Sequence, residues 1–407
     1  MGHPFTMLEL EEAIARILGA TPPPTVESVP LTDAHGRILL EPLRSPVNLP
    51  VFDNSAMDGY AVRAVDVAGA TPNSPARLRV AGRVAAGEAF SGALPPHSCV
   101  RLFTGSPLPT GADAVVTQED TRVPAETPGE VLVLSAVQPE ENVRFKGEDI
   151  RQGAALASPG ERLSARRIGL LAATGFERVR VGRQPVAGLL ATGSELREAG
   201  QELGPGQIYE SNRVAVAALA RLAGAVPRIY PIVADSLAAT ESMLRQALAE
   251  CDVVVSSGGV SVGEMDFVKQ ALASVGGELD YWKVNVKPGR PFVFGRLRGK
   301  LFFGLPGNPI SALVAFLLLV RPALLRGQGA TDVELPAQAG VLAEPLSNPG
   351  ERRHFMRVRI DADQKVFSGG LQASHALSSA AAANGLVDVP PGAVLATGTT
   401  VQVKRWE

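Results

Sequence analysis

The chain has 407 residues, of which 45% are hydrophobic, so it is long enough for about two to four folded domains. Its 39 basic and 41 acidic side chains leave a net charge of −2, which gives no general attraction to nucleic acid or to an anionic membrane. A binding site for an anion must therefore be built locally. The two cysteines, Cys99 and Cys251, form no zinc motif or disulfide framework, and we expect both to be reduced and packed.

The N-terminal part is predicted to be helical from Met7 to about Gly19 and to end at the proline run of residues 21–25. It has no basic-then-apolar signal pattern. The longest apolar run, residues 310–320, is too short to cross a membrane and is predicted to be a buried helix. These features predict a cytoplasmic protein without a membrane segment.

From residue 47 to about residue 150, short β-like runs are separated by glycine and proline, which predicts a small β domain. A helical segment follows, with Ser164 as its expected N-cap. Strand-like and helix-like runs then alternate up to residue 330. This alternation predicts an α/β domain with a parallel or mixed sheet and helices on both faces. The remaining residues, 331–407, again predict short strands and turns.

Ligands of such sheets bind outside the carboxyl ends of the strands. Three loops are expected there: TGSEL (192–196), SSGGVSVGEMD (256–266) and GLPGNP (304–309). The glycines and serines of the second loop suit an oxyanion, although a tight structural turn fits them equally well. Asp266 is a candidate metal ligand or helix cap, and either Asp235 or Ser236 is the expected N-cap of the next helix.

Two further stretches carry charged residues in unusual density. In KVNVKPGRPF, Lys283 and Lys287 are predicted to share one face of a strand, followed by Arg290 in a turn. These cations fit either a clamp for a polyanion or a solvated basic edge. The stretch FDNSAMDGYAVR (52–63) is dense in polar residues, and a random polar surface loop would seldom also carry Phe52, Met57 and Tyr60. The other polar motifs of the first β region are FTGSPLP (103–109) and RFKGEDI (144–150).

The chain resembles the MoeA family of molybdopterin molybdenumtransferases, which is itself similar to the C-terminal domain of gephyrin. The resemblance rests on eight motifs in the same order along the chain: FDNSAMDGYA, FTGSPLP, GEDI, ATGSEL, SSGGVSVGEMD, KPGRP, GLPGNP and QASHALSSAAAANGL. The resemblance runs from about Leu8 almost to the end. It implies an elongated chain with a discontinuous helical domain (1–46 plus 150–180), an inserted β domain (47–149), an α/β molybdopterin-binding domain (181–330) and a C-terminal β-barrel (331–407). It also implies a homodimer whose cleft lies between the α/β domain of one subunit and the inserted β domain of the other.

The reaction implied by this resemblance inserts molybdenum from molybdate into adenylylated molybdopterin and releases AMP, with Mg²⁺ as the divalent cation. The catalytic residues that it implies are Asp58, Thr104, Arg144, Asp149, Glu195, Asp235, Asp266, Lys283 and Lys287, with Glu195, Asp235 and Asp266 as metal ligands. The substrate-binding residues that it implies are Ser257, Gly258, Gly259, Ser261, Gly263, Arg290, Pro306, Gly307, Asn308, Pro309, Arg353, Ser374 and Ser378. Ser194 stands where many members have an acid, and Arg290 where lysine is frequent.

Two other functions are compatible with parts of the sequence. A molybdopterin adenylyltransferase, acting one step earlier, has an α/β fold similar to the central domain but does not need the flanking β domains. A non-catalytic molybdopterin-binding scaffold is the role that gephyrin adds to its activity. The expected partners are a second copy of the chain and the molybdopterin-adenylylating enzyme, with no nucleic acid and no membrane.

Overall fold

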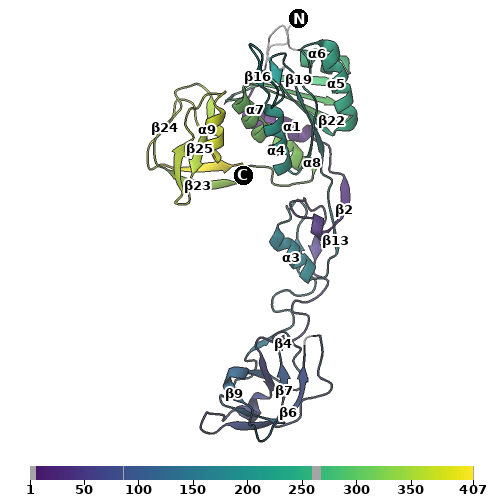
Figure 1. Ribbon diagram of the computed structural model, residues 1–407, viewed down its shortest axis with the longest axis vertical. Coiled ribbons are helices and arrows are strands. Elements are labelled where there is room, and N and C mark those ends of the chain that lie inside the picture. Colours follow the sequence, from purple (N-terminus) through teal and green to yellow (C-terminus); the bar gives the residue numbers. More distant parts are fainter. Residues whose placement is uncertain (1–5, 86, 259–266, 407) are drawn as a thin grey trace. The chain divides into compact units, whose positions relative to one another are not determined.

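The computed structural model describes residues 6–85, 87–258 and 267–406 (Figure 1). Backbone contacts divide the chain into two compact units. The first consists of Met1–Glu41, Pro159–Ser164 and Val179–Glu407, and the second of Pro42–Ser158 and Ala165–Arg178. The first unit contains the α/β and C-terminal β regions, and the second contains the inserted β region. The division into four domains with the boundaries given above stays a prediction.

The first unit is built on a seven-stranded mixed sheet (Figure 1). Strands β14, β17, β18 and β22 run parallel to one another, whereas β21 is antiparallel to both of its neighbours, β19 and β22. The strands, in sheet order, are β1 (Thr6–Leu8), β19 (Glu278–Val284), β21 (Pro291–Leu297), β22 (Lys300–Leu305), β18 (Val253–Ser257), β14 (Val186–Ala191) and β17 (Val226–Ile229).

Helices cover both faces of this sheet, as predicted. The alternation along β18 shows why, because Val253 and Val255 belong to one hydrophobic cluster and Val254 to another. The first cluster includes residues of α1 (Leu10–Ala20), α4 (Asn212–Leu222), α7 (Pro309–Ala315), the π-helical turn Phe316–Val320 and α8 (Arg321–Gly327). The second includes residues of α5 (Leu237–Glu250) and α6 (Phe267–Ser274).

The stretch Pro309–Gly327 is, among the described residues, the one helical segment long and apolar enough to cross a membrane, and 78% of it is buried. It is therefore a core helix, as expected for residues 310–320.

The N-terminal prediction needs a correction, because Met7 and Leu8 lie in strand β1 and the helix begins only at Leu10. The pairing of β1 with β19 supplies their hydrogen bonds, which local helical spacing does not reveal. The helix ends at Ala20, before the prolines, as predicted.

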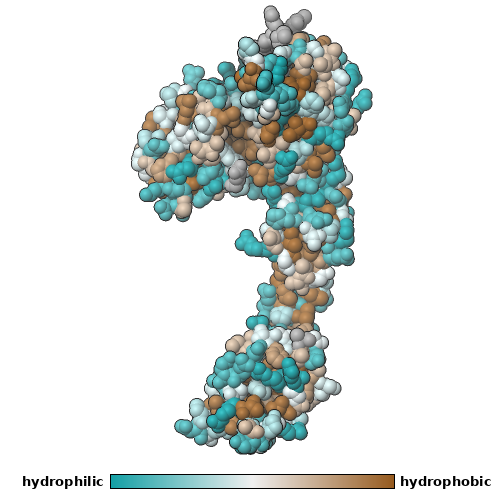
Figure 2. All heavy atoms as spheres, viewed as in Figure 1, coloured by the Kyte–Doolittle hydropathy of each residue, from teal (hydrophilic) through white to brown (hydrophobic). Residues whose placement is uncertain are grey.

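The C-terminal region of the first unit forms a closed β-barrel. Strand β25 pairs with both β26 and β27, which closes the ring β25-β26-β23-β29-β27. Its elements are β23 (Ala337–Leu342), β24 (Leu346–Ser347), β25 (Arg353–Ile360), β26 (Lys365–Ser368), α9 (Leu377–Ala382), β27 (Gly385–Val389), β28 (Val394–Leu395) and β29 (Thr400–Arg405). A groove of about 350 Å³ lies between α4, α7 and α9. Figure 2 shows hydrophobic residues in a hollow at this place, so the apolar interior reaches the surface beside the barrel.

The second unit contains a six-stranded sheet in the order β8-β5-β7-β6-β10-β9, which confirms the predicted β region. Its strands are β8 (Ala114–Thr117), β5 (Gly59–Val62), β7 (Ser98–Leu102), β6 (Ala76–Val84), β10 (Glu130–Val133) and β9 (Thr121–Arg122). Further elements are β3 (Leu43–Arg44), β4 (Asn54–Ser55), α2 (Ala64–Val67), the 3₁₀ turn Gln118–Asp120, β11 (Val143–Arg144), β12 (Ala155–Ala157) and α3 (Ala165–Ala173), which begins directly after Ser164.

Short pairings complete the first unit. Strand β2 (Val26–Pro30) pairs with β13 (Arg178–Gly182), and the two-residue strand β15 (Leu196–Arg197) pairs with β16 (Ile208–Tyr209). The remaining strand, β20 (Val286–Lys287), lies between β19 and β21 in sequence but pairs with β25 of the barrel. This crossover positions several of the candidate site residues.

Candidate functional site

Asp58 directly precedes β5, at a position where the backbone packs very closely. A Cβ atom on Gly59 would lie 2.0 Å from the carbonyl oxygen of Val116, so only glycine fits beside Asp58. The Asp58 carboxylate accepts two hydrogen bonds of 2.8 Å, one from the backbone N–H and one from the hydroxyl of Thr104. These bonds, with a smaller contribution from Arg101, hold the pKa of Asp58 below its usual value. Two of the predicted catalytic residues therefore lie in direct contact, and one is a carboxylate kept ionised.

The three polar motifs of the inserted β region come together in the second unit. Strand β4 pairs with β11, which places Asn54 opposite the predicted catalytic residue Arg144. Ser55 forms backbone hydrogen bonds with the 105–106 segment that follows Thr104. Asp149 is exposed a few residues beyond Arg144. The residues predicted from FDNSAMDGYA, FTGSPLP and RFKGEDI therefore belong to one neighbourhood.

The motifs of the α/β domain also meet, at the carboxyl ends of β14, β18 and β22. Both outer strands pair in parallel with β18, so their ends lie side by side. After Ser257, Gly258 has a left-handed φ of +83°, and a Cβ atom there would lie 3.0 Å from the carbonyl oxygen of Thr192. A Cβ atom on Gly307 would lie 3.9 Å from the Cα of Gly258. The predicted meeting of the three loops is thus confirmed. The other predicted residues of the central loop lie outside the described residues: Gly259, Ser261, Gly263 and Asp266.

The acids predicted to bind a metal lie at the end of β14. The backbone N–H of Ser194 donates a 2.8 Å hydrogen bond to the carboxylate of Asp235, and Glu195 is the next residue and is exposed. The N-cap of α5 is Ser236, whose hydroxyl accepts from the backbone N–H of residue 239. Asp235 is therefore not needed as a cap. In the described part of the chain no group of three or more metal-ligating side chains is present, so these residues offer a two-carboxylate site at most.

Lys283 and Lys287 lie on different strands, so the prediction that they share one strand face is wrong. Lys283 belongs to β19 in the seven-stranded sheet, whereas Lys287 belongs to β20 and pairs with the barrel. The chain changes sheets at Asn285. Its backbone N–H donates to the carbonyl of Leu8 (2.9 Å), and its side-chain amide donates to Glu9 (2.8 Å). These long-range bonds anchor the crossover, and alternation along the sequence does not reveal them.

Four basic residues gather where β20 meets the start of β25. We call Lys287, Arg290, Arg352 and His354 the basic junction. Lys287 and His354 are direct partners in the strand register, and the Arg352 guanidinium donates to the carbonyl of Val286 at 3.1 Å. Burial, together with the charge of Arg290, lowers the pKa of Arg352, which places these two cations near one another. Within the described ranges, none of the four forms an ion pair with a carboxylate.

His354 is the buried member of the basic junction. It is 2% exposed, and its Nε2 atom has no hydrogen-bond partner among the described residues. Burial, followed by the charges of Lys287, Arg357 and Arg352, lowers the pKa of His354 from 6.5 to about 4. The imidazole is therefore neutral at pH 7 while the lysine and arginines around it are charged. Such an arrangement attracts an anion and leaves one uncharged polar nitrogen beside it.

Arg353, unlike its neighbour, already has carboxylate partners. Its Nη1 atom donates to Glu11 at 2.6 Å, and its Nε and Nη2 atoms donate to Asp388. These two acids raise the pKa of Arg353. The predicted contact between Arg353 and an anion would require breaking these bonds, so Arg352 has the better position for that role.

The GLPGNP loop contacts the barrel segment that carries the predicted serines. Pro309 is the first residue of α7, as expected for a proline at a helix start, and Asn308 stands at the N-cap position. The backbone N–H of Ile310 donates to the carbonyl of Ser374 at 3.0 Å. Ser374 therefore lies beside the loop of residues 306–309, whereas Ser378 is exposed on α9.

The two cysteines take no part in this arrangement. Both are free thiols and both are buried, as expected. Burial raises the pKa of Cys99 to about 12 and also raises the pKa of Cys251. Neither thiol is a candidate nucleophile.

Comparisons with known families cover almost the whole chain. Residues 8–175 match the MoeA N-terminal region (domain I and II), residues 188–326 match the probable molybdopterin binding domain, and residues 339–406 match the MoeA C-terminal region (domain IV). A curated relative from Mycobacterium tuberculosis, molybdopterin molybdenumtransferase 2, is 39% identical over 406 residues, which is 98% of each chain. The chain belongs to the MoeA family.

Other MoeA relatives agree with this assignment. The molybdopterin molybdenumtransferase of Haemophilus influenzae is 38% identical over 379 residues, or 92% of each chain. Two solved structures of molybdopterin biosynthesis MoeA proteins from Pyrococcus horikoshii are 34% and 28% identical, with TM-scores of 0.80 and 0.82. They cover 99% and 98% of this chain, and the match includes all of each solved chain. The recognition of the family from sequence motifs is therefore confirmed, and the chain has the MoeA-type multidomain fold.

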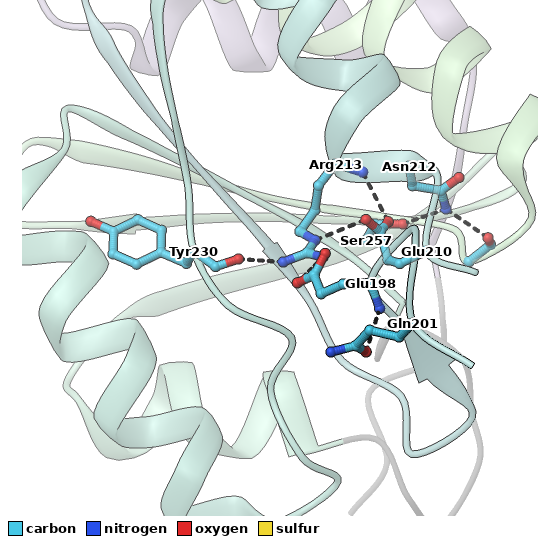
Figure 3. Close-up of polar contacts among 8 residues, drawn as sticks. Glu198, Gln201, Glu210, Asn212, Arg213, Tyr230 and Ser257 are labelled. Carbon is cyan, nitrogen blue, oxygen red and sulfur yellow. Dashed lines mark hydrogen bonds and ion pairs between the residues drawn. The ribbon is translucent and has the colours of Figure 1, made fainter. Parts of the chain in front are cut away.

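One part of this MoeA site is missing from the sequence-based prediction. Figure 3 shows a polar network at the start of α4, centred on Asn212 and Arg213. The Asn212 amide donates to the hydroxyl of Ser257 (2.6 Å) and to the carbonyl of Gly307 (2.8 Å). In the sequence, these residues stand in YESNRVAV, where polar residues at a helix start are read as capping residues. No local signal distinguishes a cap from a side chain that reaches two distant loops.

Proposed function

We propose that this MoeA-family chain inserts molybdenum from molybdate into adenylylated molybdopterin and releases AMP. The observation that carries the proposal is the basic junction, where cations without carboxylate partners in the described ranges stand beside the loops of an α/β sheet. Both substrates are anions, and a chain with a net charge of −2 must attract them locally. Curated relatives over the full length are named molybdopterin molybdenumtransferase, which supports the same reaction.

The residues on the two sides of the sheet end have different roles in this reaction. Gly258 and the GLPGNP loop bind the pterin and phosphate groups through their backbone N–H groups, which the close approach of Gly307 to Gly258 brings together. Lys287, Arg290 and Arg352 bind molybdate, with Lys283 on the neighbouring strand and Ser374 beside the loop. Water attacks the adenylyl phosphorus, the phosphoanhydride bond breaks, and AMP, molybdopterin phosphate and a proton are formed. The two thiol sulfurs of molybdopterin then bind molybdenum, and one molybdate oxygen leaves as water with the two thiol protons. The lysine and arginine charges stabilise the negative charge that develops on the phosphate oxygens.

Mg²⁺ fits the acids at the end of β14. Magnesium is commonly held by one or two carboxylates together with substrate phosphates, and Glu195 and Asp235 are two hard oxygen ligands of this kind. The Ser194 amide orients the carboxylate of Asp235. Asp266, which lies outside the described residues, is the third candidate ligand. When bound there, the ion would neutralise charge on the phosphate oxygens.

We extend the proposal to a cytoplasmic homodimer that receives its substrate from the molybdopterin-adenylylating enzyme. In this dimer the α/β domain of one subunit works with Asp58, Thr104, Arg144 and Asp149 of the other. A mixture of two inactive variants tests this directly. If Asp58→Asn and Lys287→Met subunits are refolded together, half of the dimers carry one intact site, so about a quarter of the wild-type activity should return. No recovery in confirmed mixed dimers would mean that each site lies within one chain.

The reaction itself is tested by measuring AMP release from adenylylated molybdopterin with and without molybdate. Molybdate-dependent release is expected, and Lys287→Met should abolish it while Lys365→Met, which removes an exposed charge from barrel strand β26, should not. AMP release that is independent of molybdate would contradict metal insertion. An adenylyltransferase would instead form adenylylated molybdopterin from ATP with release of pyrophosphate, and a scaffold would bind the pterin without turnover.

A further inference from the structure

Asn212 joins two loops of the candidate site with a single side chain. It lies at the first position of α4, is 8% exposed, and donates from one amide nitrogen to both Ser257 and Gly307 (Figure 3). Ser257 ends β18 and precedes the glycine turn, and Gly307 lies in the loop between β22 and α7. The amide therefore bridges the two segments that we assign to pterin and phosphate binding.

The loop around Gly307 depends on such an outside bond. Pro306 and Pro309 have no backbone N–H, so only two of the four residues 306–309 have a backbone N–H to donate. A loop with so few donors has little means of fixing its own conformation through backbone hydrogen bonds. Asn212 supplies the bond from outside, because its side-chain amide donates to the Gly307 carbonyl. The distance between the loop and the glycine turn is thus set by α4.

The end of α4 is itself held rigidly by Arg213. This guanidinium is 2% exposed and makes two bonds of 2.9 Å to Glu198, one of 2.9 Å to Glu210, and a bond to the carbonyl of Tyr230. Glu198 follows the β14 loop that carries Glu195. One helix end therefore contacts the last residue of β18 and the segments that follow β14, β17 and β22 (Figure 3).

We infer that Asn212 is a positioning residue, which holds the GLPGNP loop and the glycine turn at the separation that the pterin substrate requires. The inference rests on the proposed function for the identity of the substrate. Asn212 acts through Ser257 and Gly307 and does not itself contact substrate. Its loss should weaken substrate binding and leave the bond-breaking groups at the basic junction in place.

Asn212→Leu is the main test, because it keeps a side chain branched at Cγ, adds no charge and removes both hydrogen bonds. Gln328→Met is a matched control. Gln328 is 1% exposed and its amide also donates twice at 2.8 Å, to the carbonyl of Ala223 at the opposite end of α4 and to the carbonyl of Leu324 in α8. Both variants lose two buried amide bonds at one helix, so both should lower the thermal midpoint by a similar amount.

Only Asn212→Leu should raise the KM for adenylylated molybdopterin, by about tenfold, with kcat within about twofold of wild type. A purely structural role would reduce the active fraction in both variants, which lowers kcat and leaves KM unchanged. Ser257→Ala is the milder second variant, since it removes one of the two bonds, and its KM should rise by about threefold. Unchanged KM values in both Asn212→Leu and Ser257→Ala would overturn the inference.

Amide hydrogen exchange separates this inference from the proposed function. The backbone N–H groups of Gly258 and Ile310 flank the two loops and donate to the carbonyls of Leu305 and Ser374. In Asn212→Leu they should exchange at least about tenfold faster than in wild type, while Gln328→Met should leave them unchanged. This arm needs no substrate. If wild type fails to bind adenylylated molybdopterin but the exchange result holds, the proposed function is wrong and the positioning role stands. Equal exchange in all three proteins contradicts the positioning role.

Discussion

The buried imidazole of the basic junction predicts a specific dependence of stability on pH. In the folded chain the pKa of His354 is lowered from 6.5 to about 4 by burial and by neighbouring cations. In the unfolded chain the imidazole takes up a proton near pH 6.5, whereas in the folded chain it does so only near pH 4. The unfolded state therefore binds more protons between these values, and the free energy of unfolding falls as the pH is lowered from 6.5 to 4.

The size of the effect follows from the two pKa values. The full difference corresponds to about 3 kcal/mol, of which about 2 kcal/mol is already lost at pH 5. His354→Gln replaces the imidazole with a neutral side chain and should remove this part of the pH dependence. Because all other titrating groups are shared, the difference between the two proteins isolates one titration.

The assay is urea denaturation of wild type and His354→Gln at intervals from pH 7.5 to pH 4.5. The variant should gain about 2 kcal/mol relative to wild type between pH 7 and pH 5, whatever its stability at pH 7. His35→Gln, which changes an exposed histidine of the same unit, is the control. A difference between wild type and His354→Gln that stays constant over this range would refute the reasoning, because the imidazole would then titrate alike in both states.

Three other predictions test the second unit. Gly59→Ala should destabilise the chain by at least about 1–3 kcal/mol in denaturant unfolding because its Cβ would overlap a carbonyl oxygen, while Gly129→Ala, which enters open space, should change little. Cys99 should resist alkylation at pH 8 in the folded chain and react after denaturation, since a pKa of about 12 leaves only about one thiol in ten thousand ionised. Thr104→Val should raise the pKa of Asp58, because one of its two stabilising hydrogen bonds is lost, and should move the acid limb of the kcat/KM profile to higher pH; an unmoved limb would separate Asp58 from that ionisation.

The positions of the α/β loops could be predicted from the sequence because they follow from a general rule of such sheets. Parallel strands end at one edge, so TGSEL, the glycine turn after Ser257 and GLPGNP had to meet once the strands were recognised. The pairing of Asp58 with Thr104 is different in kind. It is formed between strands far apart in sequence, and only the family resemblance suggested that both residues belong to one site.

The errors have a common physical cause, which is tertiary pairing that overrides the local pattern. Lys283 and Lys287 have the spacing of one strand face, but bonds from Asn285 to the N-terminal segment move the chain into another sheet. Met7 has helical spacing with the residues after it, but it forms a strand because it pairs with Lys283 of β19. The choice between Arg352 and Arg353 is not one of these errors, and the binding role of either stays a prediction. The two are indistinguishable by residue type, and only the acids that surround Arg353 show which guanidinium is already engaged.

The contrast between the two polar clusters of the first unit supports the roles assigned to them. Arg213 is buried with its guanidinium bonded to two acids and a backbone carbonyl, as expected of a residue that fixes a scaffold. His354 and Arg357 are equally buried, yet one nitrogen of each lacks a partner among the described residues. A buried polar atom without a partner costs free energy, and a fold retains such atoms mainly where a ligand completes their bonding. The satisfied cluster is therefore suited to a positioning role, and the unpartnered nitrogens of His354 and Arg357 fit the anion site proposed above.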